Sequence, residues 1–444
     1  MKRKWLYQVL ILTISLFIGL SSNLAIICDH HWVESSILPP VVTVFRDNHQ
    51  YAFMLGWDDE MDDLRFSFIE DEFGFRHTSF AVTGRLNDSV FWGLDMLFRG
   101  HDIQSHSSEH LHFARLNSSR IELLLGQSIN DIERLYGYTP IVFAYPFGSH
   151  SSESDSIIPN YFDVGRGIGS EKTNRGAWPI TSRSCCLHSA PGCHGITGDV
   201  VDRLTISFEE MLNNEGHRAY KCYGHSGWFD ARERSQFEKE LSKIAEHDDL
   251  WLTTWGEAIA YQVVRDHTVI EDYHTYSENI KFKTVAPELN ISRYPVPVTY
   301  RVEIPRDWDN LAVLDDGRII PHKIVENSSG EYLLLNSIPR GQIIEITTQR
   351  VVDTTGPVIS GIHIRYTAEG VLVLFEVSDF HGTVCDVNMT IVTDIGSFDF
   401  DRIVNPTFWS NNTYGRVVFN ASDIYAITVM ASDSSGNIGV FSNE

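Results

Sequence analysis

Apolar and polar positions change their spacing along the chain. Between about residues 51 and 261, short apolar runs alternate with stretches in which apolar residues recur every three or four positions. The first spacing is typical of buried strands and the second of amphipathic helices. Strands are expected at residues 51–57, 76–84, 100–106, 140–148, 161–169, 217–225 and 250–255. Repeated strand–helix units predict a parallel sheet, either open or closed into a barrel.

The clearest helix is expected over residues 117–137. Ser119 and Glu122 have the spacing of a capping box, and Gly137 is placed to end the helix. The apolar residues between them recur on one face. Further helices are expected at about residues 61–73 and 229–247, and after residue 255.

The pattern becomes all-β after about residue 261. Residues 267–284 are interpreted as a polar connector, strands are expected from about residue 279, and residues 351–360 mark a second joint. The last segment has short alternating strands with Asp, Ser and Gly in the turns, which is typical of an immunoglobulin-like sandwich. The expected domains are an α/β domain over residues 28–268, a β-rich accessory domain over residues 269–350 and a β-sandwich over residues 351–444.

Residues 1–27 have the layout of an export signal. Three basic residues precede an apolar run that is nearly long enough to span a bilayer. We expect either a signal peptide or a membrane anchor, and hence a secreted or cell-surface protein; a buried N-terminal helix is the alternative. Seven glycosylation sequons agree with export. They begin at Asn87, Asn117, Asn290, Asn327, Asn388, Asn411 and Asn420.

Charge and cysteine content narrow the class of protein. The formal net charge is −24, and so acidic a surface repels phosphate backbones, so nucleic acid is not an expected partner. Nothing in the sequence indicates whether the protein is a monomer or an oligomer. In an exported chain, clustered cysteines predict local disulfides. The cluster consists of Cys185, Cys186, Cys193 and Cys222. Adjacent Cys185 and Cys186 would be strained as a pair, which leaves two connectivities open, and a zinc site with His188 and His194 is the alternative.

Side chains with catalytic potential fall at the ends of the predicted strands. In parallel α/β folds the carboxyl ends of the strands lie at one edge, where ligands bind. The residues expected at this edge are Asp58, Asp59, His106, His110, Tyr145, Arg166 and His225. Tyr145 either contributes to a pocket or packs in the core. Carboxylates, imidazoles and an arginine are therefore expected to converge.

The two histidines of "HSSEH" suggest a metal site. His106 and His110 are four residues apart and would face the same way on a helical turn. With one carboxylate they form three ligands and leave a position for water on a divalent metal. A bound metal lowers the pKa of water and polarises a carbonyl. Such a ligand set accepts zinc, cobalt, nickel or manganese.

This pattern resembles the polysaccharide deacetylase family, the NodB-type carbohydrate esterases. "LGWDDE" resembles the family's T-F-D-D-G, and "GHDIQSHSSEH" matches G-H-E-[IL]-[GA]-[SN]-H-[ST]-x-x-H. "AYPFG" matches R-x-P-x-G in part, and "YGH" resembles L-x-H. The second motif is strongly specific, and the resemblance covers about residues 51–261. It implies a distorted (β/α) barrel as the catalytic domain, which two small all-β domains follow in this chain.

The resemblance also implies an activity and the residues that perform it. The activity is hydrolytic removal of acetyl groups from N- or O-acetylated polysaccharide with a divalent metal, most often zinc. Carried over motif by motif, the resemblance makes Asp59, His106 and His110 the metal ligands. It makes Asp58 the catalytic base and His225 the acid. The expected substrate is an acetylated cell-surface or extracellular glycan.

The chain departs from the family pattern at two positions. Glu60 replaces the glycine of the first motif, and Ala144 stands where the third motif has its arginine. That arginine orients the catalytic aspartate in the family. Arg166, at the end of the next predicted strand, is the expected substitute. A fourth family motif, an aspartate followed by a tryptophan, supplies no residue here.

Two other functions remain open. "HSSEH" also fits H-x-x-E-H, a zinc peptidase pattern in which Glu109 would be the base. That mechanism needs a long helix, whereas a strand precedes this motif and two serines, which are weak helix formers, lie inside it. The missing third-motif arginine favours an inactive glycan-binding surface protein, in which Trp308 and Trp409 would stack on sugar unless they are buried. His101 and His112 are interpreted as structural.

Overall fold

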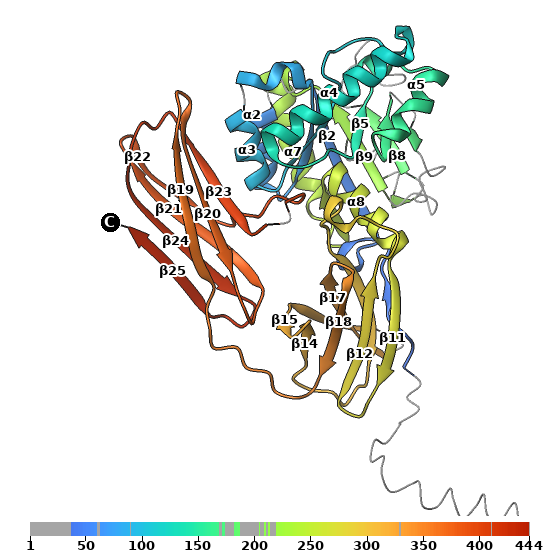
Figure 1. The fold of residues 1–444 in the computed structure, drawn as a ribbon, viewed down its shortest axis with the longest axis vertical. Helices are drawn as coiled ribbons and strands as arrows, with labels where there is room; N and C mark the ends of the chain where they lie inside the picture. Colours follow the sequence, from blue (N-terminus) through green and yellow to red (C-terminus); the bar gives the residue numbers. More distant parts are fainter. Residues whose placement is uncertain are drawn as a thin grey trace, which may run out of the picture.

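The chain forms an α/β domain, a β domain below it and a β-sandwich beside both, as the computed structural model in Figure 1 shows. The structure describes residues 37–59, 63–88, 90–167, 171–173, 182–186, 204, 208–209, 212–213, 219–327, 330–409 and 411–443. The expected signal or anchor at residues 1–27 lies outside these ranges, as do Cys193 of the cysteine cluster and the alternative zinc ligands His188 and His194. Within them, no helix combines the length and apolarity that a membrane crossing requires.

A curled, almost entirely parallel sheet is the centre of the α/β domain. Its strand order among the described residues is β7-β6-β5-β4-β3-β2-β9-β8, with β10 beside β2. The strands are β2 (Tyr51–Asp58), β3 (His77–Ala81), β4 (Asp102–Ser105), β5 (Val142–Ala144), β6 (Val164–Arg166), β7 (Glu171–Thr173), β8 (Ser182–Cys186), β9 (Ala219–Gly224) and β10 (Leu250–Thr253). Among the described strands of this sheet, only β6 and β7 pair antiparallel. The predicted α/β class, with all-β sheets after it, is therefore confirmed.

Six helices cover the sheet in the described part of the chain. They are α2 (Asp63–Glu72), α3 (Val90–Phe98), α4 (Ser118–Tyr136), α5 (Ser152–Ile157), α7 (Ala231–Ile244) and α8 (Trp255–His267). The capping box expected at the start of α4 is wrong, because Asn117 is the N-cap and its side chain accepts from the Arg120 N–H. Asn and Ser are equally good caps, so the sequence does not distinguish them. Gly137 ends α4 in the left-handed conformation, as predicted.

Aromatic packing behind β2 holds this strand in place. The Trp57 ring contacts Phe66 of α2 and Phe237 of α7 edge-on, with ring centroids 4.9 and 5.6 Å apart. Its indole N–H donates to Glu70 at 2.8 Å. The strand end that follows Trp57 is therefore anchored on both helices.

The second domain consists of two antiparallel sheets. One has the order β1-β13-β17-β16 and the other β11-β12-β18-β14-β15. The strands are β1 (Val41–Val42), β11 (Val269–Thr275), β12 (Asn279–Val285), β13 (Val298–Ile304), β14 (Ala312–Asp315), β15 (Arg318–Ile319), β16 (His322–Asn327), β17 (Gly330–Ser337) and β18 (Arg340–Thr347). The strand β1 lies within the range expected for the α/β domain, yet it pairs with β13 of the second domain.

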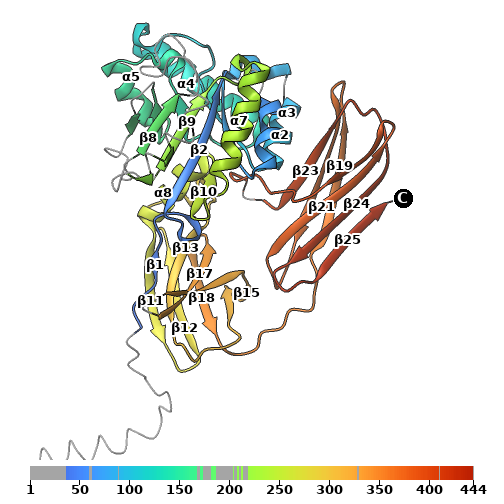
Figure 2. The same cartoon turned by 180° about the vertical axis from the view of Figure 1, so that it is seen from behind.

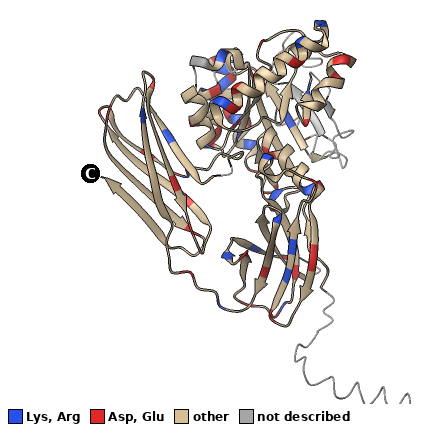
Figure 3. Ribbon diagram, in the orientation of Figure 1, with Lys and Arg blue, Asp and Glu red and all other residues tan. Residues whose placement is uncertain are grey.

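The polar connector expected at residues 267–284 is instead the hairpin of β11 and β12. Along β12 every second side chain is buried, so Ile280 and Phe282 enter the core while the lysines between them face outward. Lys281 and Lys283 pair with Glu345 and Glu271 on the neighbouring strands. Figure 3 shows acidic and basic positions next to one another on the strands of this domain. Charged residues occupy the outward-facing positions of this hairpin, so the segment was interpreted as polar although its side chains alternate as in a strand.

The C-terminal sandwich has sheets of order β19-β20-β23 and β22-β21-β24-β25. Its strands are β19 (Val358–Tyr366), β20 (Gly370–Ser378), β21 (Val384–Thr393), β22 (Gly396–Phe400), β23 (Thr413–Phe419), β24 (Ile424–Asp433) and β25 (Ile438–Asn443). Figures 1 and 2 show β23 next to α3. Trp409 packs on Phe98 and donates to the Tyr136 carbonyl at 2.7 Å, and Trp308 is buried. Both tryptophans therefore pack within the protein, which is the alternative to stacking on sugar.

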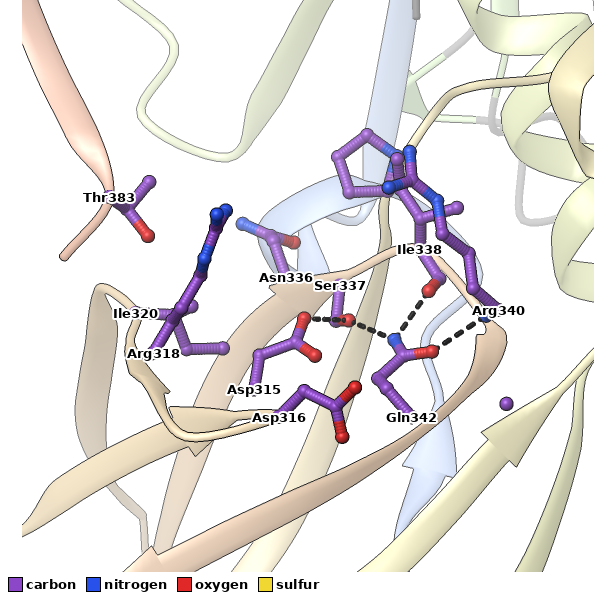
Figure 4. A pocket seen from close by; sticks show the side chains of 12 residues that line it. Asp315, Asp316, Arg318, Ile320, Asn336, Ser337, Ile338, Arg340, Gln342 and Thr383 are labelled. Carbon is purple, nitrogen blue, oxygen red and sulfur yellow. Dashed lines mark hydrogen bonds between the residues drawn. The ribbon is translucent and has the colours of Figure 1, made fainter. Parts of the chain in front are cut away.

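A polar pocket of about 510 Å³ lies between the two β domains. Figure 4 shows Thr383 of the sandwich across from Arg318 and Ile320 of the second domain. Inside it, the Ser337 hydroxyl donates to Asp315 at 2.6 Å and accepts from Gln342 at 2.7 Å. Hydrogen-bonded residues of the second domain therefore line most of the pocket, and the sandwich forms one of its walls.

Candidate functional site

Two consecutive carboxylates reach the same site because β2 ends in a turn. Side chains alternate along a strand, so Asp58 and Asp59 would otherwise point to opposite faces. Asp59 instead adopts a left-handed conformation with φ of 75°, which is uncommon for a residue with a side chain. Its N–H still donates to the Phe80 carbonyl on β3 at 3.2 Å. The turn is therefore held by the sheet.

His106 and His110 lie in a loop, and the expected helical turn between them is wrong. The segment after β4 has no helix until residue 113, and Ser107 has a φ of 73°. This left-handed residue bends the chain so that the two rings have centroids 5.0 Å apart. The predicted proximity of the two histidines is present, although it arises from a different backbone.

Asp59, His106 and His110 converge on one point. Asp59 Oδ1 is 3.2 Å from His110 Nε2 and 3.7 Å from His106 Nε2. Asp59 Oδ1 and His110 Nε2 are both buried and have no aligned hydrogen-bond partner in the described structure. Buried polar atoms without a partner are costly unless another group satisfies them. One carboxylate and two imidazoles fit a divalent metal of the zinc class.

The His106 ring is fixed in the state that a metal ligand needs. Its Nδ1 lies 2.8 Å from the Ala144 carbonyl, which can only accept, so Nδ1 carries the proton and Nε2 a lone pair toward Asp59. Burial lowers the pKa of His106 to about 3. Burial also lowers the pKa of His110. Both rings are therefore neutral at physiological pH, as metal ligation requires.

Arg166 occupies a buried position beside Asp58. Its guanidinium forms an ion pair with Asp58 Oδ1, and the residue as a whole is 2 % exposed. The guanidinium carbon also lies over the Phe80 and Tyr223 rings, 4.6 and 4.4 Å from their centroids. Ala144, where the family has its arginine, is the direct Cα partner of Arg166 across β5 and β6. An arginine thus reaches Asp58 from the adjacent strand.

His225 follows β9 and lies on the other side of the Asp59 carboxylate. Its Nε2 is 3.5 Å from Asp59 Oδ2. The ring stacks on Trp228 at a centroid distance of 4.1 Å and an angle of 6°. Six of the seven residues expected at this edge, all except Tyr145, are therefore brought together, and what each does there stays a prediction.

Sequence reasoning missed Asp63, which supports the loop that carries His225. The Ser226 hydroxyl donates to Asp63 Oδ1 at 2.6 Å, and Ser79 of β3 donates to the other oxygen. Burial raises the pKa of Asp63 to about 6. Among the acidic residues at 58–63, nothing in the sequence marks this one as buried; a serine directly after the predicted catalytic histidine was the only signal.

Two half-exposed aromatic rings were also missed. Trp228 and Phe147 are 48 % and 50 % exposed, and Phe147 lies against the His110 and His112 rings, 4.2 and 4.1 Å away. Tyr145 turns the other way: it is buried, and its hydroxyl donates to Asp155 at 3.0 Å. Packing, rather than the pocket, is therefore the role that the structure gives Tyr145.

Glu109 does not adopt the geometry of a peptidase base. Its carboxylate forms an ion pair with Arg120 at 2.6 Å and its side chain is about half exposed. The loop conformation at Ser107 excludes the long helix that this mechanism needs.

A second buried cluster, Glu70, His77 and His101, lies at the start of β3 and β4, away from the strand ends that carry the site. His101 Nδ1 accepts from the His77 backbone N–H at 3.0 Å, and His101 Nε2 lies 3.2 Å from Asp71. His77 Nδ1 bonds Glu70. Both nitrogens of His101 are thus engaged within the protein, in keeping with a structural role.

Comparison with known families supports the motif assignment. Residues 55–161 match the family model for polysaccharide deacetylase. This segment contains Asp58, Asp59, His106 and His110, so the resemblance inferred from the motifs is confirmed there. No curated protein matches the chain.

Three solved structures are similar to parts of the chain. One is the Xyl-CE4 domain of a multidomain xylanase from the hindgut metagenome of Trinervitermes trinervoides, with 14% identity, a TM-score of 0.34, and coverage of 48% of this chain and 92% of that one. A variant of the peptidoglycan deacetylase PdaC from Bacillus subtilis has 16% identity, a TM-score of 0.33, and coverage of 47% and 90%. A family 4 acetyl xylan esterase from Clostridium thermocellum, in complex with cobalt, has 17% identity, a TM-score of 0.34, and coverage of 47% and 89%.

Proposed function

We propose that the chain is a metal-dependent deacetylase that removes acetyl groups from N- or O-acetylated polysaccharide at the cell surface or outside the cell. The supporting observation is that two consecutive carboxylates have different partners. Asp59 lies among imidazoles, whereas Asp58 is paired with the guanidinium of Arg166. Such a pair suits two different tasks, metal binding and proton transfer. The family match over residues 55–161 supports the same reaction class.

Asp59, His106 and His110 are the residues that would hold the metal, with zinc as the first candidate and cobalt, nickel and manganese as others. When bound, the metal supplies a Lewis acid that polarises the acetyl carbonyl and lowers the pKa of water. The Ala144 carbonyl fixes the His106 ring, so one of the three ligands is oriented before any metal binds.

Asp58 is the proposed general base. Its Oδ1 is held by Arg166, which leaves the other oxygen as the acceptor for a proton from the attacking water. Asp58 is buried, and aromatic rings surround the guanidinium that orients it. The carboxylate therefore has one orientation relative to the metal ligands, which is what base catalysis requires.

His225 is the proposed acid. The departing amine or hydroxyl of the sugar needs a proton, and His225 Nε2 lies next to the site, 3.5 Å from Asp59. Stacking on Trp228 restricts the ring to this orientation.

Trp228 and Phe147 are the proposed contacts for sugar rings. Each lies against a histidine of the site, Trp228 on His225 and Phe147 on His110, and each has about half of its surface exposed. The apolar face of a sugar packs well on an exposed aromatic ring. Two such rings suit a polymer better than a small free amide.

An inactive glycan-binding surface protein is the second candidate function. Its main argument was the missing arginine of the third motif. The ion pair of Arg166 with Asp58 weakens this argument, because a guanidinium is present at the same carboxylate.

Acetate release distinguishes the two functions. The full chain is incubated with a panel of N- and O-acetylated glycans, with and without a chelator. Acetate that appears only without the chelator supports the deacetylase. Binding to glycan with no acetate released from any member of the panel supports the surface protein instead.

A further inference from the structure

Three carboxylates converge at the end of the sandwich where the linker enters. Asp353 lies in the linker before β19, Asp379 follows β20 and Asp433 ends β24. One side-chain oxygen of each lies within 4.8 Å of one oxygen of each of the others. Asp379 and Asp433 are only 7 % and 4 % exposed. We propose that these three residues bind one divalent cation of the calcium type.

Two of the carboxylates present a buried oxygen that has no partner. Asp379 Oδ1 accepts from the backbone N–H groups of His381 and Gly382 at 2.9 and 2.7 Å, and Asp353 Oδ1 accepts from the Thr355 N–H at 2.9 Å. The second oxygen of each, Oδ2, is buried and unbonded within the described structure. The local turns therefore bond one oxygen of each carboxylate, and the second oxygen stays available to a ligand in the cluster.

No lysine or arginine in the described part of the chain forms an ion pair with this cluster. Among the ion pairs of the described residues, none joins Asp353, Asp379 or Asp433 to such a side chain. Gathered and partly buried negative charges repel one another, and a bound cation relieves that repulsion.

The donor set favours calcium. All three donors are carboxylate oxygens. Hard cations such as calcium favour an all-oxygen ligand set more strongly than zinc-class metals do. Calcium takes oxygens at about 2.3–2.6 Å, so two of its ligands lie up to roughly 5 Å apart, as in this cluster. Ligands from one linker and two loops give an irregular arrangement, which calcium accepts more readily than magnesium does. Water and backbone carbonyls would complete the shell.

Gly382 and Asn437 shape the site. A Cβ on Gly382 would lie 2.8 Å from Asp353 Oδ2, so only glycine lets the linker carboxylate approach so closely. The Asn437 amide donates to Asp433 Oδ2 at 2.9 Å and to the Asp353 carbonyl at 3.2 Å. The linker is thus already held against the β24–β25 loop, and the cation would add a second connection.

The site adjoins the contact between the two β domains. The loop after Asp379 meets β15, where the Ile319 N–H donates to the His381 carbonyl at 2.8 Å. The hydroxyls of Thr383 and Ser434 both donate to the Ile319 carbonyl, at 3.1 and 3.2 Å. Figure 4 shows Thr383 at the wall of the pocket between the domains. Cation binding would therefore hold the sandwich in its orientation to the second domain.

Calcium titration of matched variants tests the proposal. Binding to the chelator-stripped full chain is measured by calorimetry for the unchanged protein, Asp353→Asn and Asp394→Asn. The first change keeps an acceptor for Thr355 and removes one charge from the cluster. Asp394 is the control, because it lies in the same sandwich and accepts from the Ser422 and Asp423 N–H groups at 2.9 and 3.0 Å, outside the cluster. Neither change touches the α/β domain, so their difference reports the linker site alone.

Asp353→Asn is expected to weaken calcium binding by about tenfold or more, because ligand charge sets calcium affinity. Asp394→Asn is expected to leave it unchanged. Trypsin gives a second readout: calcium should slow cleavage after the exposed Arg350 in the unchanged chain and not in Asp353→Asn. The same isotherm for both variants, or no calcium binding by the unchanged chain at about 1 mM, overturns the proposal. Tighter binding of magnesium overturns the assignment to calcium.

Discussion

Arg166 at the end of β6 and Asp58 at the end of β2 form a buried ion pair, although they are 108 positions apart in the sequence. Ala144, the residue at the family's arginine position, is the strand neighbour of Arg166. The guanidinium therefore approaches the carboxylate from one strand further along the sheet.

Arg166→Ala is expected to lower kcat by roughly 100-fold, since a misplaced catalytic group costs about that much, while metal content stays unchanged. Arg166 pairs with Asp58, and no ion pair or hydrogen bond of the described structure joins it to a proposed ligand, so kcat should fall without a loss of metal. The double change Ala144→Arg with Arg166→Ala places a guanidinium on the neighbouring strand and should restore part of the rate. Metal content that falls in step with kcat contradicts this positioning role.

The two adjacent aspartates should respond differently to the same substitution. Asp58→Asn should keep the metal and lose roughly 100-fold or more in turnover, because it removes the base. Asp59→Asn removes an anionic ligand, so metal affinity should fall first and activity should partly return at high metal concentration. Metal content and acetate release measured on each variant test this. Metal loss in Asp58→Asn with retention in Asp59→Asn means that the roles are exchanged.

His225→Ala should keep the metal and lose turnover. The loss should be smallest for substrates with good leaving groups, because these need little protonation. Rates for a series of acetyl esters of decreasing leaving-group pKa measure this dependence. An equal loss along the whole series argues against an acid role. Metal loss in this variant would make His225 a ligand instead.

Asp102, at the start of β4, makes stability depend on pH. Burial raises the pKa of its carboxyl to about 7, and its Oδ2 accepts from the Gly256 N–H at 3.0 Å. A pKa raised by folding means a contribution to stability that is present at acid pH and is lost as pH rises from about 4 to about 7. Asp102→Asn should therefore reduce the gain in Tm between pH 8 and pH 5. Thermal unfolding of both proteins at the two pH values measures this, and parallel curves contradict it.

The sequence predicted which residues meet more reliably than how the backbone brings them together. Strand ends in a parallel sheet share an edge, so Asp58, His106, Arg166 and His225 could be placed there from the pattern alone. The left-handed residues Asp59 and Ser107 are not glycines, and no composition rule indicates them. The expected helical turn at His106 was wrong for that reason.

The burial of polar residues was the second feature that the sequence did not predict. Asp63 lies in an acidic run that reads as a helix start, yet it is 1 % exposed and bonds two serines from distant strands and loops. α3 was not expected either, because seven of its nine residues are buried and it shows no periodic polar face. Tertiary contacts decide both cases, and a single sequence does not contain them.

The central claim is that Asp59, His106 and His110 form a metal-dependent deacetylation centre. Its most direct test is to titrate zinc into the chelator-stripped chain and follow acetate release from an acetylated glycan on the same sample. The account predicts that release rises from near zero and saturates at about one equivalent of zinc, the stoichiometry of a three-ligand site, and that the double change His106→Ala with His110→Ala shows neither binding nor release. Full acetate release without metal, or release that survives the loss of both histidines, would contradict it.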